Sequence, residues 1–280
     1  MEFGMIPYDG LTKEDFILPE TEQPFLPGNK NNAPLFYLGL SKWTYKEEEK
    51  KKNSPYPQPG TLPYYAKHFN AIELNATHYE IPSADKITKW RQSVEDSNFQ
   101  FCPKWYKGIS HAGKVDLHKT GLAKQFLQSM EPFKEKLGTG FLQVPDQSPV
   151  EDAEDLLRFL RSLPAPLDLS IELRNAGRFA DQARFSSLVK SLNSLGKGLV
   201  ITDSPGRRDA VHMQLSNTTA FIRFNAQGDH ELDLFRIDEW KKTLRSWYRQ
   251  GLEKCYFFLH IHSQEFEDDF ISYARHELTF

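Results

Sequence analysis

Residues 167–174 read Leu-Asp-Leu-Ser-Ile-Glu-Leu-Arg, and this stretch decides the fold class. Apolar residues at positions 169, 171 and 173 alternate with Ser170, Glu172 and Arg174. Because successive side chains of a strand point to opposite faces, the stretch predicts a strand with one apolar and one polar face. The same alternation occurs in residues 72–77 and 220–225.

Eight apolar runs of this length recur along the chain, and helix-like stretches separate them. The predicted strands are Leu35–Leu40, Ala71–Thr77, Phe99–Trp105, Thr139–Pro145, Leu167–Arg174, Gly198–Ser204, Thr219–Asn225 and Lys254–His262. The predicted helices lie near Leu62–Phe69, Ala84–Val94, Thr120–Lys136, Val150–Ser162, Ala180–Leu195, Ile237–Gln250 and Phe266–Glu277, and Pro205–Asn217 has room for only a turn or two. Strands that alternate with helices indicate βαβ units and a parallel sheet.

Eight such units predict an α/β fold, a (β/α)8 TIM-type barrel in a single domain, rather than an open doubly wound sheet. We expect residues 35–280 to form the barrel. Residues 1–34 hold scattered Pro, Gly, Asn and acidic residues, and we expect an N-terminal extension packed against the barrel. An antiparallel sheet whose polar residues face water is the alternative, and the intervening helices oppose it.

The composition excludes several classes of protein. With 39% hydrophobic residues in a chain of 280, the protein has enough apolar material for a large core, which excludes a wholly disordered chain. The net charge of -3 gives no support for nonspecific binding to nucleic acid or to an anionic membrane. Cys102 and Cys255 lie in apolar runs and predict free thiols. We find no signal-peptide pattern and no apolar run of the roughly 18–20 residues that span a bilayer, so we expect a cytoplasmic protein without a membrane partner.

A barrel whose apolar strand faces meet the helices directs its polar strand residues to the barrel axis. The later residues of most strands are polar, and these residues would lie near the C-terminal mouth, where barrel enzymes carry their chemistry. They are Ser41, Glu73, Asn75, Lys104, Gln143, Glu172, Arg174, Asp203, Arg223, Asn225, His260 and His262. A cluster that contains both signs of charge predicts a functional site.

The ordered motifs of the chain resemble a known family. The matching pieces are Gly39–Tyr45, Tyr56-Pro57 with Leu62–Phe69, Glu73–Tyr79, Lys104 with Ser110-His111, Leu137–Pro145, Glu172-Leu-Arg174, Asp203 and Arg223. In this set the chain resembles the YecE-like proteins, the family called domain of unknown function 72 (DUF72). The resemblance implies a TIM-type barrel and no settled activity. The chain departs from the family pattern at Lys42 (usually Gly), at His78 (usually Phe) and in Phe258-Leu-His260-Ile-His262 (usually of the Phe-Asn-Asn type).

Three cations, Lys104, Arg174 and Arg223, are predicted to face one cavity. Arginine offers a rigid fork that matches a carboxylate or phosphate, and lysine offers a movable point charge. One hypothesis is that they hold an anionic ligand group. The other is that they neutralise the carboxylates in a buried ion-pair network. Both hypotheses can hold together, because such a network also orients ligand groups.

The carboxylates Glu73, Glu172 and Asp203 could act as general acid and base. Together with His260 and His262 they could also bind a divalent metal through mixed nitrogen and oxygen ligands. The nearby cations would repel a metal ion, so we predict no cofactor and keep a divalent metal as the alternative.

Aromatic residues and one histidine complete the predicted site. Trp43, Tyr45 and Tyr79 follow strand ends, where aromatic faces can stack sugars or bases or simply anchor loops. His111 is a candidate proton shuttle, because imidazole titrates near neutral pH. The predicted catalytic residues are Glu73, Lys104, Glu172 and Asp203. The predicted substrate-binding residues are Ser41, Trp43, Asn75, Thr77, Tyr79, His111, Gln143, Arg174, Arg223, Asn225, His260 and His262.

These residues favour an enzyme that uses acid/base chemistry on a small anionic ligand, phosphorylated or sugar-like. A metal-dependent phosphodiester hydrolase or nucleic-acid-binding protein, by analogy with barrel endonucleases, is the first alternative, and it rests on fold analogy alone. A non-catalytic ligand-binding protein is the second. The sequence leaves the oligomeric state open.

Overall fold

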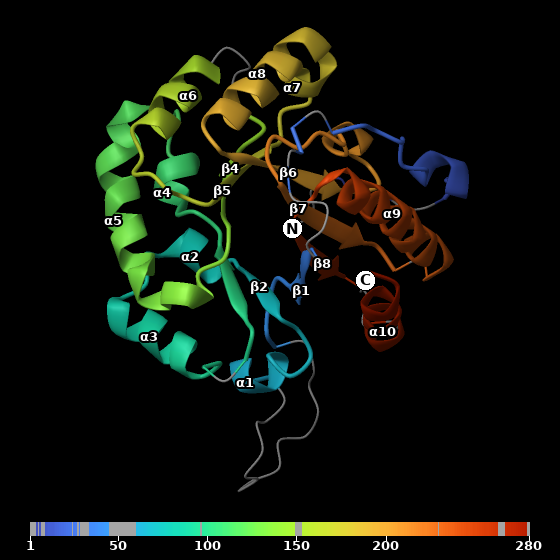
Figure 1. The fold of residues 1–280 in the computed structure, drawn as a ribbon, viewed down its shortest axis with the longest axis horizontal. Helices are drawn as coiled ribbons and strands as arrows, with labels where there is room; N and C mark the ends of the chain where they lie inside the picture. The colour runs from blue at the N-terminus through green and yellow to red at the C-terminus, as the bar shows by residue number, and fades with distance from the viewer. Residues whose placement is uncertain are drawn as a thin grey trace, which may run out of the picture. The chain divides into compact units, whose positions relative to one another are not determined.

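The structure is a computed structural model, and it describes residues 4, 6, 9–23, 25–26, 28, 34–44, 60–95, 97–148, 153–228, 230–262 and 267–278 (Figure 1). The chain divides into two compact units. One is Tyr37–Arg178, called the middle unit below. The other comprises Met1–Phe36 and Phe179–Phe280, and is called the terminal unit.

Eight parallel strands carry the fold. They are β1 (Leu35–Leu40), β2 (Ala71–Leu74), β3 (Gln100–Pro103), β4 (Gly140–Val144), β5 (Leu169–Leu173), β6 (Gly198–Asp203), β7 (Thr219–Ala226) and β8 (Lys254–Ile261). Their hydrogen-bonded order is β3-β2-β1-β8-β7-β6-β5-β4. Isolated bridges from Phe101 to Leu137 and from Lys104 to Phe141 then join the β3 and β4 segments inside the middle unit. The predicted (β/α)8 barrel is confirmed.

Helices follow the strands along the chain. The α-helices are α1 (Leu62–Tyr65), α2 (Ala76–Tyr79), α3 (Ala84–Gln92), α4 (Lys107–Ser110), α5 (Thr120–Met130), α6 (Ala153–Arg161), α7 (Gly177–Ala180), α8 (Gln182–Ser194), α9 (His230–Gln250) and α10 (Glu267–Leu278). The short 3-10 helices are η1 (Lys13–Phe16), η2 (Leu117–Lys119), η3 (Glu131–Lys136) and η5 (Arg208–Ala210). Within the described residues, no helix has both the length and the apolar character needed to cross a bilayer.

In the middle unit, the side chains of Gln143 and Glu172 lie one layer beyond those of Phe141 and Ser170. Fully buried Phe141 precedes Gln143 on one face of β4, and Phe141 pairs in register with Ser170, which precedes Glu172 on β5. Helices α3, α5 and α6 lie along the outer side of this unit (Figure 1). Gln143 and Glu172 therefore sit toward the C-terminal ends of β4 and β5, above a layer that contains Phe141 and Ser170.

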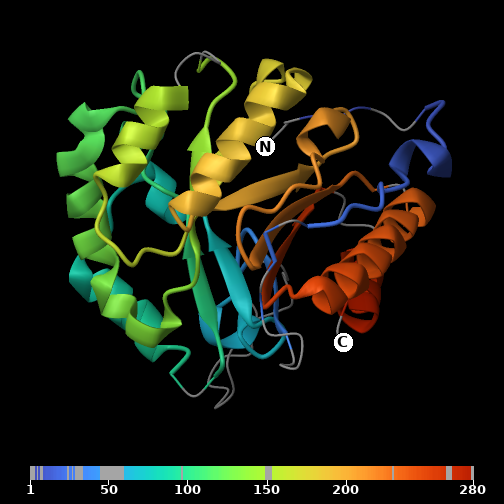
Figure 2. The same cartoon turned by 45° about the horizontal axis from the view of Figure 1, so that its top comes forward.

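In the terminal unit, the N-terminal segment lies beside α9 (Figure 2). The connection from β6 to β7 contains only the short helix η5. Helix η1 lies close to η5, because Arg208 of η5 contacts the ring of Phe16 in η1. Phe16 of η1 is 1% exposed, and the guanidinium groups of Arg208 and Arg236 lie 5.2 and 5.4 Å from its ring centre. The backbone N–H of Leu18 donates to Oε2 of Glu239 on α9 at 3.2 Å. The segment thus packs where the β6–β7 connection provides no long helix.

Gln23 fixes the following part of this segment. Its Nε2 donates to the carbonyl of Met213 at 2.8 Å, and its Oε1 accepts from the backbone N–H of Leu215 at 3.0 Å. Its own N–H donates to Oε1 of Gln250 at 2.8 Å. The predicted extension therefore packs on the loop before β7 and on the end of α9.

Candidate active site

Four buried side chains of the middle unit form one chain of hydrogen bonds. Lys104, next after β3, donates through Nζ to Oε1 of Gln143 at 3.1 Å. Gln143 of β4 donates through Nε2 to Oε2 of Glu172 on β5 at 2.5 Å. Arg174 donates through Nε at 3.1 Å and Nη2 at 2.9 Å to Oε1 of Glu172. The network therefore carries a cation at each end and a carboxylate within it.

The strand register explains this arrangement. Gln143 and Glu172 are directly paired in the parallel ladder of β4 and β5, so their side chains leave the same face side by side. A buried charge is costly unless it is hydrogen-bonded. The amide of Gln143 meets this need, because its oxygen accepts from Lys104 while its nitrogen donates to Glu172.

Two histidines lie next to this network. The rings of His78 (α2) and His111 (the residue after α4) meet edge to face, with centres 4.9 Å apart. His78 Nδ1 lies 2.8 Å from the carbonyl oxygen of Trp105, so Nδ1 carries the proton and donates. His111 Nδ1 lies 2.7 Å from Oγ of Ser110. His78 is buried, whereas His111 is exposed.

The surroundings of both rings favour the neutral imidazole. Burial, helped by the positive charge of Lys104, lowers the pKa of His78 to about 4. Partial burial lowers the pKa of His111 as well, and Lys104 and Arg174 add to this effect. The carboxylate of Glu172 and a hydrogen bond with Gln143 oppose the shift. His78 is therefore neutral at pH 7, and the lowered pKa of His111 favours its neutral form.

Glu73 and Asn75 come from the end of β2. Asn75 donates through Nδ2 to Oε1 of Glu73 at 2.9 Å, and Glu73 is fully buried. Strand β2 ends at Leu74 rather than at the predicted Thr77, because the chain turns into α2. The hydroxyl of Thr77 lies 2.8 Å from the carbonyl oxygen of Leu74 and 2.7 Å from that of Lys104. Thr77 thus fastens α2 to the end of β3, and its role in ligand binding stays a prediction.

The predicted aromatic residues differ in their surroundings. Tyr79 is 67% exposed, with Nζ of Lys107 at 5.8 Å from its ring centre. Trp43 instead packs edge to face on Trp90 of α3, with ring centres 5.6 Å apart, which anchors the loop after β1. Tyr45 lies outside the described residues. Ser41 follows β1 directly and is partly buried.

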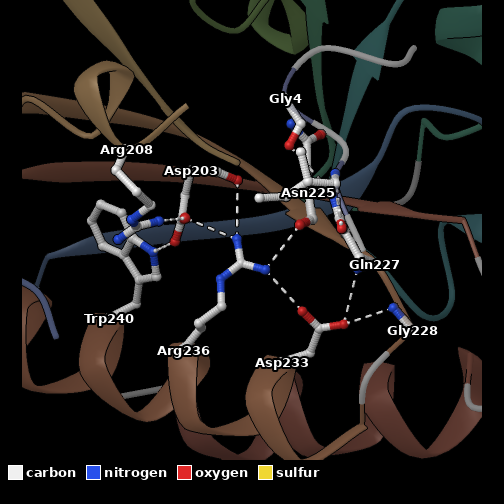
Figure 3. Close-up of polar contacts among 10 residues, drawn as sticks. Gly4, Asp203, Arg208, Asn225, Gln227, Gly228, Asp233, Arg236 and Trp240 are labelled. Atoms are coloured by element: carbon white, nitrogen blue, oxygen red, sulfur yellow. Dashed lines mark hydrogen bonds and ion pairs between the residues drawn. The ribbon is translucent and has the colours of Figure 1, made fainter. Parts of the chain in front are cut away.

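Asp203 of the terminal unit does not lie on the predicted face. It pairs in register with Phe224, whose ring packs 5.8 Å from that of Phe270 on α10, so both side chains face the helices. Its Oδ1 accepts from Arg236 at 2.8 Å and from Arg208 at 2.5 Å (Figure 3). The prediction that Asp203 faces the barrel axis is wrong, and its catalytic role remains without support.

The carboxylate of Asp203 is held ionised. Trp240 donates to its Oδ2 through Nε1 at 2.6 Å (Figure 3). Burial acts to raise the pKa of Asp203, but Arg236 and Arg208, with the hydrogen bond from Trp240, outweigh it and bring the pKa to about 2. Arg236 is also paired with Asp233 at 2.8 Å, so one buried guanidinium joins β6 to the start of α9.

Arg223, Asn225 and His260 share the other face of β7 and β8. Arg223 and Asn225 alternate with Phe224, and His260 pairs in register with Asn225. All three are buried. His262 lies beyond the end of β8 and is exposed, so the two histidines of this strand differ in environment. Their predicted binding roles stay predictions.

The metal alternative gains no support from the described part of the chain. No group of three or more His, Cys, Asp or Glu residues there is arranged to hold a metal ion. The carboxylates of Glu172 and Asp203 are each bound by arginine instead.

Sequence reasoning missed several residues that contribute to these clusters, among them His78, Ser110, Arg236 and Trp240. The sequence marks His78 only as a departure from the family pattern and Ser110 only as part of a matching motif, and it predicts no site role for either. Arg236 and Trp240 lie within a helix whose start was predicted at Ile237, whereas α9 begins at His230. The signal that could have pointed to Arg236 is Asp203 itself, because a strand carboxylate facing the helices requires a cation there.

Comparison with known proteins agrees with the fold and the motifs. The family model described as "Protein of unknown function DUF72" matches residues 37–274. UPF0759 protein YecE of Escherichia coli (strain K12) is 29% identical over 246 residues, which cover 81% of this chain and 86% of YecE. Two crystal structures of a DUF72 family protein from Enterococcus faecalis V583 share the fold, with TM-scores of 0.67 and 0.68 at 20% and 19% identity. They cover 88% and 89% of this chain, and the matches span 96% and 99% of those chains. The chain therefore belongs to the DUF72 family.

Proposed function

We propose that the protein is an enzyme that performs acid/base chemistry on a small anionic substrate, phosphorylated or sugar-like, at the C-terminal ends of β3, β4 and β5. The observation that carries this proposal is the buried chain of Lys104, Gln143, Glu172 and Arg174 beside two neutral histidines. Titratable groups with shifted pKa values next to fixed charges are typical of active sites.

The contacts favour a particular division of roles. Both carboxylate oxygens of Glu172 accept hydrogen bonds, from Gln143 and from Arg174, so Glu172 positions these groups rather than moving a proton itself. His111 is exposed and neutral at pH 7, so it can accept a proton from a bound substrate. Lys104 and Arg174 supply the positive charge that attracts the anionic group.

The test is a thermal-shift screen of phosphorylated sugars and sugar acids, followed by turnover assays of every stabilising compound. A ligand at a hundred times its Kd stabilises the native state by about 2.7 kcal/mol, so even moderate affinity is detectable. We expect Lys104→Met to abolish the stabilisation and His111→Gln to retain binding but lose turnover. His118→Gln is the matched control, because His118 is an exposed histidine of the same unit, in η2.

Two results would count against the proposal. Stabilising ligands that the protein never converts would favour the non-catalytic binding protein instead. A His111→Gln variant with full turnover would remove His111 from the reaction and leave the proposed division of roles without its acid/base group.

A further inference from the structure

We propose that the pair His78 and His111 takes up one proton when a doubly charged oxyanion, such as a phosphate monoester, binds beside Lys104. The inference rests on the proposed function, because it names the class of anion that the same site would take. It adds that binding of the anion changes the protonation state of the two histidines.

The hydrogen bonds of His111 allow it to gain a proton without losing a partner. Its Nδ1 lies 2.7 Å from the hydroxyl of Ser110, and a hydroxyl can either donate or accept. When Nδ1 is bare, Ser110 donates to it; when Nδ1 is protonated, the hydroxyl rotates and accepts. A hydrogen bond with Gln143 favours the charged imidazole of His111.

The two rings act as one proton-binding unit. Because Nδ1 of His78 already donates to the carbonyl of Trp105, an added proton on this ring would go to Nε2. With ring centres 4.9 Å apart, a charge on one imidazole opposes a charge on the other. The pair therefore takes one proton rather than two, and exposed His111 is the ring that meets a ligand.

The charges around the pair decide when this proton binds. Lys104 just after β3, Lys107 in α4 and Arg174 just after β5 face the pair with positive charge, and Glu172 of β5 faces it with negative charge. Burial, together with this excess of positive charge, favours the neutral form of both rings when no anion is bound. A bound dianion reverses the sign of the nearest charge and so favours the imidazolium. A singly charged carboxylate would raise the pKa of the pair less than a dianion does.

Sulfate is the direct probe, because it remains a dianion across the pH range in which histidine titrates. Isothermal titration calorimetry from pH 5.5 to 8 would be run in two buffers that differ in ionisation enthalpy, which counts the protons taken up. We expect the Kd for sulfate to rise by up to about tenfold per pH unit above the pKa of the free pair, with uptake approaching one proton per sulfate. Acetate, a monoanion, should bind at least about tenfold more weakly and with less proton uptake.

Three variants assign the effect to the pair. His111→Gln should still bind sulfate but with little dependence on pH, because the exposed ring carries the proton. His78→Phe, with the residue usual in the family, should move the pH dependence to higher pH, since it removes the competing ring. His118→Gln should behave as the wild type.

The outcomes separate this inference from the proposed function. Sulfate binding that is independent of pH and takes up no proton overturns the coupling and leaves an anion site in place. Equal affinity for acetate and sulfate overturns the choice of a dianion. Absence of sulfate binding by the wild-type protein overturns the inference, and turnover in the metabolite screen then decides the proposed function independently.

Discussion

Replacing Asp203 by asparagine should destabilise the protein strongly although the side chain keeps its shape. Asp203 is 1% exposed, and its two oxygens accept hydrogen bonds from Arg236, Arg208 and Trp240 (Figure 3). The Asp203→Asn change removes the negative charge and turns one acceptor into a donor that faces a guanidinium or the indole N–H. Arg236, which is also 1% exposed, would then keep only Asp233 as a carboxylate partner among the described contacts.

Two independent estimates give the magnitude. The fall in the pKa of Asp203 from 3.8 to about 2 corresponds to about 2–3 kcal/mol of stability at neutral pH. Removing one partner of a buried ion pair costs about 3–5 kcal/mol. Because Asp233 remains 2.8 Å from Arg236, the lower end applies, and we expect a loss of about 3 kcal/mol.

Urea unfolding at pH 7 measures this loss, with Asp209→Asn as the matched control. Asp209 is paired with Arg207 in the same loop, but its side chain is 32% exposed, so the control should lose less than about 0.5 kcal/mol. The difference between Asp203→Asn and the wild type should be constant above about pH 5 and shrink as the pH falls from 3.8 toward 2, because the carboxylate is then protonated. A variant within about 1 kcal/mol of the wild type at pH 7 would refute the ion-pair argument.

Three further predictions concern the terminal unit. Phe16→Ala should lower the free energy of unfolding by about 3–5 kcal/mol, measured by urea titration, and a loss below about 1 kcal/mol would show that the N-terminal segment is not part of the core. Burial lowers the pKa of His212 from 6.5 to about 4, so the free energy of unfolding should fall as the pH drops from 6.5 toward 4. Between pH 7.5 and 5 this loss of stability should be at most about 2 kcal/mol, and it should be smaller in His212→Gln. A Cβ on Gly206 would lie 2.8 Å from Cγ2 of Ile6, so Gly206→Ala should accelerate amide exchange at residue 206. Gly121→Ala in the middle unit is the control and should not, because a Cβ there meets no atom within 4 Å and the backbone has no positive φ.

The fold could be predicted from the sequence because parallel strands buried on both sides are short, apolar and separated by helices. Strand β1 occupies the predicted residues, Leu35–Leu40, and β6 ends one residue before the predicted Ser204. The error at β2 has a nonlocal cause: α2 is fastened to β3 through the hydroxyl of Thr77, and no period in the sequence reports that contact. The early start of α9 is likewise set by Asp233, which accepts from the backbone N–H groups of Gln227 at 3.0 Å and Gly228 at 2.9 Å.

The sides of the strands were harder to predict than the strands themselves. In β5, polar and apolar residues alternate, so the face that carries Glu172 is marked in the sequence. In β6, Leu199, Val200 and Ile201 are apolar in succession, so the period carries no information about the side on which Asp203 lies. Only the register with β7 decides it. The histidine pair was missed for a related reason, since His78 reaches His111 through two single-turn helices that the sequence does not mark.

The contrast between the two buried carboxylates bears on which cluster carries chemistry. Asp203 is surrounded by two arginines and an indole N–H, and each of these donors also fixes an element of the fold. Glu172 is bound by one arginine and by an amide that leads to Lys104, and two neutral imidazoles adjoin this network. Buried ion pairs also occur in purely structural networks, so on their own they do not identify an active site. The histidines supply what the Asp203 cluster lacks, a group whose protonation can change near neutral pH under the influence of a ligand, and for this reason we place the candidate chemistry at the ends of β3, β4 and β5.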